Sequence, residues 1–124
     1  MWIMLNKSFL SVVADRDDKD NLLVRARLAG HIESVFPEAK IFSRVGSDYL
    51  YRAILPRSEV AAVIANNIEN INYDNFKNSV KNKVLHDAFI DIWGIMYRLQ
   101  ERFDPTKKRS KFKQDDYDFS DSTL

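Results

Sequence analysis

The stretch from Lys83 to Phe103 carries more apolar residues than one face of a surface helix can hold. With successive residues placed about 100° apart, its apolar side chains form a continuous seam and then extend onto a second flank. The seam contains Val84, Leu85, Ala88, Phe89, Ile92, Ile95, Met96, Leu99 and Phe103, and the flank contains Ile90, Trp93 and Tyr97. Together they span roughly 220° of the helix circumference. Such a helix must be covered on two sides, either by its own domain or by another chain.

The rest of the composition is typical of a globular protein. The chain has 124 residues, of which 45% are hydrophobic, which predicts one domain with a core. It contains no cysteine, so disulfides, thiolate metal ligands and thiol nucleophiles are excluded. The formal net charge of +1 gives no overall field that favours nucleic acid or a membrane surface. Because no apolar run approaches the roughly 18 residues of a membrane span, we predict a soluble cytoplasmic protein.

Alternating apolar and polar residues predict strands in the first half of the chain. The predicted strands are residues 9–14, 22–28, 40–45 and 49–55, with residues 2–5 as an optional fifth. The polar run at 15–21 closes one predicted hairpin, and Gly46-Ser47-Asp48 closes the other.

Helical spacing predicts the remaining elements. They are a short helix at 31–36 ended by Pro37, a helix at 59–71 with Ser58 as its N-cap, a helical turn near 76–80, and the long helix. The inward stripe of the 59–71 helix is predicted to contain Val60, Ala61, Ile64, Ile68 and Ile71. The order β-β-α-β-β-α-α indicates an α+β fold with an antiparallel sheet of four or five strands, helices on one face, and a ferredoxin-like-related order.

The character of the chain changes after Asp104. Residues 105–124 hold a basic block followed by an acidic block, with few apolar residues. Such a segment cannot bury enough surface to offset the entropy lost on ordering. We therefore predict a single domain at residues 1–104 and a disordered tail at residues 105–124.

No pattern of residues predicts catalysis or a cofactor. The acidic turn that starts at Asp15 lacks the glycine and the glutamate of a calcium-binding EF-hand loop. His86 and Asp87 are neighbours in a helix, where adjacent side chains do not face each other. Asp87 and Asp91 lie one turn apart, but we interpret them as solvated carboxylates. We predict no catalytic, cofactor or metal residue, and hence a non-enzymatic protein.

The second flank of the long helix is the predicted protein interface. Ile90, Trp93 and Tyr97 are either core residues or anchors for a partner, because tryptophan and tyrosine bury a large area with few rotatable bonds. The heptad-like spacing of the main seam also permits self-association through this helix. The leading hypothesis is a protein-interaction module that binds another protein through these three residues.

The alternative hypothesis is a nucleic-acid-binding protein. Arg25 and Arg27 point away from the apolar face of their strand, and Phe42 and Arg44 do the same on theirs. Basic residues interleaved with aromatic residues on an open sheet stack bases and hold phosphates in some RNA-binding domains. The near-neutral charge of the whole chain argues against this alternative.

Several short segments resemble a family of short bacterial proteins of unknown function, some of them carried on mobile elements. The segments are Met1–Asn6, Ser8–Ser11, Leu23–Arg27 and Asn75–Val80. The resemblance covers roughly residues 1–100 and implies no activity, cofactor or catalytic residue. By analogy, an association with mobile elements implies a small inhibitor of phage type that acts by binding a host protein.

Overall fold

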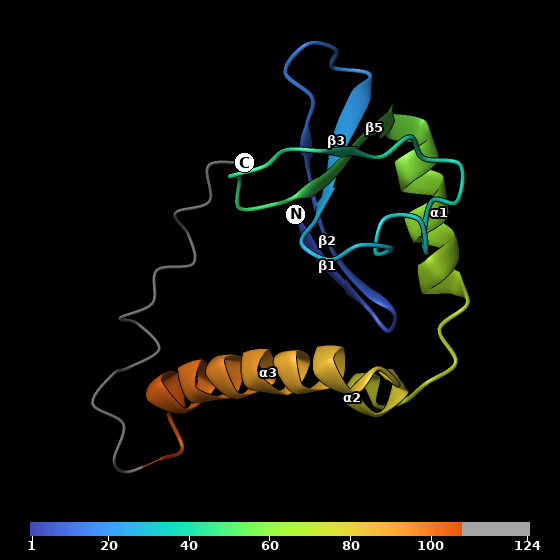
Figure 1. The fold of residues 1–124 in the computed structure, drawn as a ribbon. Helices are drawn as coiled ribbons and strands as arrows, with labels where there is room; N and C mark the ends of the chain where they lie inside the picture. The colour runs from blue at the N-terminus through green and yellow to red at the C-terminus, as the bar shows by residue number, and fades with distance from the viewer. Residues whose placement is uncertain (108–124) are drawn as a thin grey trace. The chain divides into compact units, whose positions relative to one another are not determined.

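The computed structural model describes residues 1–107, whose contacts form two units: residues 1–85 and a unit that begins at His86. The first unit contains a five-stranded antiparallel sheet with helix α1 (Figure 1). The elements are β1 (Trp2–Leu5), β2 (Ser8–Ala14), β3 (Asn21–Ala26), β4 (Phe42–Ser43), β5 (Tyr51–Pro56), α1 (Arg57–Glu69), α2 (Phe76–Ser79) and α3 (Lys83–Phe103). The predicted α+β class is therefore confirmed, with residues 2–5 as the fifth strand.

The sheet has the order β1-β2-β3-β5-β4, so β1 and β4 are its edge strands. Since side chains alternate across a strand, every second residue faces α1. These residues form the core together with Val60 of α1, which packs on β3 and β5. The buried apolar strand residues are Leu10, Val12, Val24, Ala26, Ala53 and Leu55. The other face carries Arg25 and Arg52, which lie directly opposite each other on β3 and β5.

The helix predicted at residues 31–36 does not form. This segment consists of hydrogen-bonded turns, in which Ser34 N donates to Gly30 O at 3.0 Å and Phe36 N donates to Ile32 O at 2.8 Å. Gly30 with φ +87° bends the chain before the segment, and Pro37 ends it, which leaves too few residues for a stable helix. Ile32 and Phe36 are nevertheless buried in the core. The ferredoxin-like order, which includes a crossover helix here, stays a prediction.

Two further predictions about local structure are wrong. The strand predicted at 40–45 is reduced to Phe42–Ser43. Helix α1 follows Pro56 directly, and Ser58 lies inside it rather than capping it. The helix starts early because Arg57 is held by the turn before β3: its N–H donates to Asp20 O at 2.8 Å.

The inward stripe predicted for α1 is correct only in its first half. Val60 is buried and Ile64 is half-buried against the core, whereas Ala61 is exposed. Ile68 is 63% exposed and Ile71, just past the helix, is 50% exposed. The reason is that α1 contacts β3 and β5, so its last turns lie beyond the core.

The short helix α2 and the long helix α3 agree with the sequence-based predictions. Asn75 caps α2, since its side-chain oxygen accepts a hydrogen bond from Asn78 N at 3.1 Å. At the start of α3, Leu85 N donates to the Asn82 side chain at 3.0 Å. No helix within residues 1–107 combines the length and apolar composition of a membrane span.

Only the first residues of the predicted tail are described. Thr106 donates two hydrogen bonds to one Asp104 carboxylate oxygen, from its backbone N at 2.8 Å and its Oγ1 at 2.6 Å. These bonds lower the pKa of Asp104. The predicted disorder concerns mainly residues 108–124, which lie outside the described residues.

Candidate functional site

The outer edge of β1 presents backbone groups that no residue of the first unit binds. Met1 N and Val12 O are 2.8 Å apart, as are Val12 N and Met1 O, so these two residues form a hydrogen-bonded pair. In an antiparallel ladder such pairs alternate with non-bonded ones. The register then makes Ile3 and Leu10 a bonded pair and leaves Trp2 and Met4 in non-bonded positions. The N–H and C=O groups of Trp2 and Met4 therefore point away from β2, along the free edge.

The sequence of β1 lacks the residues with which proteins protect edge strands. Natural edges are blunted by charged residues, prolines, bulges or very short strands. The opposite edge strand, β4, is only two residues long. In contrast, β1 consists of Trp-Ile-Met-Leu and holds no charge and no proline. Trp2 and Met4 are also exposed, so β1 is an apolar strand whose edge and one face are both open within the first unit.

A groove of about 550 Å³ lies beside β1, within the first unit. Its walls are β1, the second half of α1 and the segment that follows α1 up to Tyr73. Ile3 and Leu5 on the strand and Ile64 on the helix join its apolar floor to the core. Ile68 and Ile71 extend this apolar surface outward. The volume falls within the range of roughly 300–1,000 Å³ that is typical of ligand sites.

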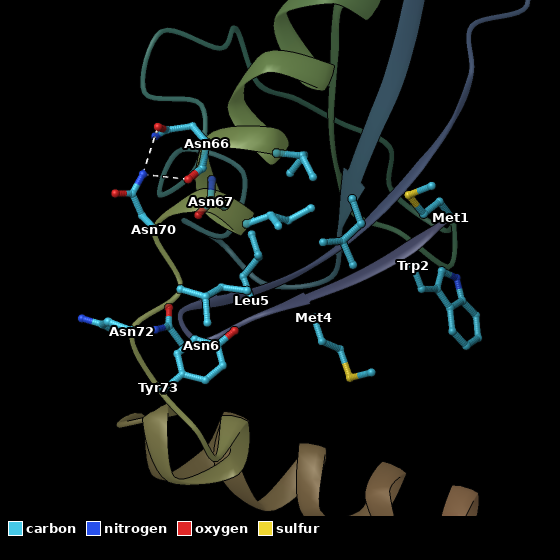
Figure 2. Close-up of a pocket in the computed structure, with 14 residues that line it drawn as sticks. Met1, Trp2, Met4, Leu5, Asn6, Asn66, Asn67, Asn70, Asn72 and Tyr73 are labelled. Atoms are coloured by element: carbon cyan, nitrogen blue, oxygen red, sulfur yellow. Dashed lines mark hydrogen bonds between the residues drawn. The ribbon is translucent and has the colours of Figure 1, made fainter.

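Carboxamide side chains form the rim of the groove, and no charged side chain lines it among the described residues. Figure 2 shows Asn66, Asn67 and Asn70 together at the α1 side and Asn6 and Asn72 beside Tyr73 at the other end. The Asn70 Nδ2 donates to Asn66 O at 2.8 Å and to Asn66 Oδ1 at 3.0 Å. The Asn67 Nδ2 donates to Val63 O at 2.9 Å, which leaves its carbonyl oxygen available as an acceptor.

The three residues of the predicted interface lie on one face of α3. Trp93 and Tyr97 stack with ring centroids 5.2 Å apart and an interplanar angle of 10°. Both are exposed, and Ile90 is half-buried. In the main seam of the helix, Leu85 and Phe89 are buried. The structure thus brings Ile90, Trp93 and Tyr97 together, and their role as a protein interface stays a prediction.

Two basic residues of the predicted nucleic-acid surface, Arg25 and Arg27, lie over the same aromatic ring. The guanidinium carbons of Arg25 and Arg27 lie 4.4 Å and 4.1 Å from the centre of the Tyr49 ring. Tyr49 is only 3% exposed, so its ring is not available for stacking on a base. Phe42 lies opposite Arg52, on the same face of the sheet as Arg25. Among the four predicted residues, Phe42 provides an exposed aromatic ring, and its role in binding nucleic acid stays a prediction.

Arg44 and Arg52 complete this group, and Arg52 was missed in the sequence. Its side chain is buried, and its Nε donates to Tyr49 O at 3.2 Å. Burial, and then the positive charges of Arg44 and Arg25, lower the pKa of Arg52, while Asp48 opposes this shift. The sequence gives no signal of this burial, because an arginine between Tyr51 and Ala53 in a strand is normally expected to face solvent.

The acidic and histidine residues assemble no metal site within residues 1–107. Asp18 organises the turn before β3, where its Oδ1 accepts a hydrogen bond from Asp20 N at 2.9 Å. His86 Nδ1 lies 3.5 Å from Asp87 Oδ1, closer than expected for adjacent helical residues, but the contact is long and exposed.

The groove residues were not recognised as a site in the sequence. The helical period predicts Ile68 and Ile71 as core residues, because the period alone does not show where a helix leaves the sheet. The sequence signal that could have indicated the groove is the uncharged strand at Trp2–Leu5.

Comparisons of the chain with protein-family models, with curated proteins and with solved structures give no match.

Proposed function

We propose that this protein is a non-enzymatic protein-interaction module that binds an extended segment of a partner protein along β1. The observation that carries the proposal is the free, uncharged edge of β1 beside an apolar groove. Many domains bind peptides by adding them as a strand to an exposed sheet edge. The backbone hydrogen bonds then supply affinity, and pockets for alternate side chains supply specificity.

The geometry of β1 defines what the bound segment looks like. The N–H and C=O groups of Trp2 and Met4 pair with an extended segment about four residues long, which spans roughly 13 Å at ~3.4 Å per residue. Every second side chain of that segment lies on the α1 side of the sheet, over Ile68 and Ile71. The intervening side chains lie beside the exposed side chains of Trp2 and Met4.

The lining of the groove also restricts the chemistry of the partner. A charged side chain placed against Ile68 and Ile71 would lose water without gaining an ion pair, which is unfavourable. Apolar side chains gain about 25 cal/mol per Å² of buried apolar surface. The carboxamides at the rim both donate and accept hydrogen bonds, so they can pair with the backbone N–H and C=O groups that flank the bound segment. We expect a partner segment that is apolar at alternate positions and uncharged on the groove side.

A selection from a random peptide library, displayed on phage and exposed to the full chain, tests this proposal. Peptides that bind should alternate apolar and other residues, and the double variant Ile68→Gln/Ile71→Gln should bind them at least about tenfold more weakly because the polar amides remove apolar surface from the groove. Both isoleucines are exposed, so the fold should be retained, as circular dichroism will show.

The matched control is the double variant Trp93→Ala/Tyr97→Ala on α3, which should bind the selected peptides as the unchanged chain does. The opposite pattern, with loss of binding in the α3 variant only, would assign the interface to Ile90, Trp93 and Tyr97 and reject the groove. Sedimentation of the unchanged chain provides a second check. A stable dimer that the Ile68→Gln/Ile71→Gln variant disrupts would mean that a second copy, and not a partner segment, covers the edge.

A further inference from the structure

Four arginines share one small area of the sheet face that lies opposite α1. Arg25 and Arg52 are directly paired across β3 and β5, and like charges in that position destabilise a sheet. Arg27 continues from β3 and shares the Tyr49 ring with Arg25. Arg44, next to β4, is close enough to act on the charge of Arg52. The fold therefore brings several positive charges close together on this face of the sheet.

The described residues compensate only part of this charge. Asp48 is the one carboxylate of residues 1–107 that forms an ion pair with any of the four arginines, at 3.9 Å from Arg52, and it is largely exposed. At this distance, and with the carboxylate screened by solvent, the pair compensates the charge of Arg52 only weakly. The other contacts of the arginines are with neutral groups. Arg25 lies over the Tyr49 ring and donates a hydrogen bond to the Ser11 hydroxyl at 2.8 Å, and Arg52 donates to the Tyr49 carbonyl oxygen.

Unused hydrogen-bond donors remain in this group. The Nε of Arg25 is buried and has no hydrogen-bond partner among the described residues. Arg27 and Arg44 are exposed, and neither side chain donates to a described acceptor. A planar guanidinium presents donors in a fork that matches the oxygens of a carboxylate or a phosphate.

We infer that the arginine cluster, defined as Arg25, Arg27, Arg44 and Arg52, binds a phosphate group. A phosphate monoester carries about −1.5 to −2 charges and three strong acceptor oxygens, so it matches several guanidinium groups at once, whereas a carboxylate carries one charge. Each phosphodiester of a nucleic-acid backbone also carries only one charge, but successive phosphates of the strand meet several arginines together. The exposed Arg27 and Arg44 make the direct contacts, and Arg25 and Arg52 behind them raise the local positive potential. The phosphate comes either from a free phosphate or phosphomonoester or from a nucleic-acid backbone. This inference is independent of the groove, which involves β1 and α1.

Isothermal titration of the full chain with inorganic phosphate, and separately with the oligonucleotide (dT)12, tests the inference at constant ionic strength. We expect binding of at least one of these probes, and a loss of about tenfold or more in affinity for Arg27→Gln and for Arg44→Gln, because each removes charge-assisted hydrogen bonds. The control Arg16→Gln, in the exposed turn after β2, should bind like the unchanged chain.

The two probes distinguish the sources of the phosphate. Binding of inorganic phosphate assigns the site to a free phosphate group. Binding of (dT)12 alone assigns the site to a nucleic-acid backbone, and the affinity should then fall steeply when the titration is repeated at higher salt. Arg27→Gln and Arg44→Gln each change an exposed residue, so circular dichroism should show an intact fold. The inference is overturned if neither probe binds, or if Arg27→Gln and Arg44→Gln bind as tightly as Arg16→Gln does.

Discussion

Replacing Phe36 by alanine is expected to lower the free energy of unfolding by about 3–5 kcal/mol, the usual cost of removing a buried phenyl group. Phe36 is 2% exposed and belongs to the core, although it lies in a segment without regular secondary structure. The loss arises from the apolar surface no longer buried and from the cavity left behind. Equilibrium denaturation in urea, followed by circular dichroism, measures it.

Phe42 provides the matched control for this prediction. It is the same residue type, lies in edge strand β4 and is 43% exposed. Phe42→Ala should therefore cost less than about 1 kcal/mol. If the two variants lose equal stability, the segment that carries Ile32 and Phe36 does not pack on the sheet as described, and the account of the core is wrong.

The second large effect concerns two neighbouring residues of β1. Met4→Pro is expected to abolish peptide binding while leaving the stability within about 1 kcal/mol of the unchanged chain. The N–H of Met4 points to the free edge, so a proline there removes no hydrogen bond to β2 but blocks the approach of another strand. Ile3→Pro should instead cost about 3 kcal/mol or more, because the N–H of Ile3 is paired with Leu10.

Both variants are compared in urea denaturation and in binding of the peptides selected from the library. A Met4→Pro variant that binds as tightly as the unchanged chain would show that no strand is added at this edge. If Met4→Pro unfolds and Ile3→Pro does not, the alternation of hydrogen-bonded pairs along β1 has been assigned the wrong way round.

The parts of the fold that follow from residue periodicity were predictable. The pattern over Lys83–Phe103 repeats for long enough that no strand fits it, and α3 has those bounds. Strict alternation in Leu22, Val24 and Ala26 predicted the strand that became the centre of the sheet. Local sequence is sufficient in such cases because the same period determines both the element and its buried face.

The parts that depend on tertiary placement were not predictable. The helical pattern at 31–36 is real, but Gly30 and Pro37 leave it too short, and its apolar residues are buried without a helix. The groove arises because α1 leaves the sheet after Ile64, and no periodicity in one helix indicates that point. The arginine cluster was found only in part, since the pairing of Arg25 with Arg52 requires the register of β3 and β5.

Amide hydrogen exchange of β1 tests the central claim most directly. In the free protein, the amide of Ile3 should exchange slowly, because it is bonded to β2, and the amides of Trp2 and Met4 should exchange rapidly. Saturation with a selected peptide should slow the exchange of Trp2 and Met4 by at least about tenfold and leave Ile3 nearly unchanged. Trp2 and Met4 amides that are already as protected as that of Ile3 in the free protein, or that exchange at the same rate with and without the peptide, would contradict the account.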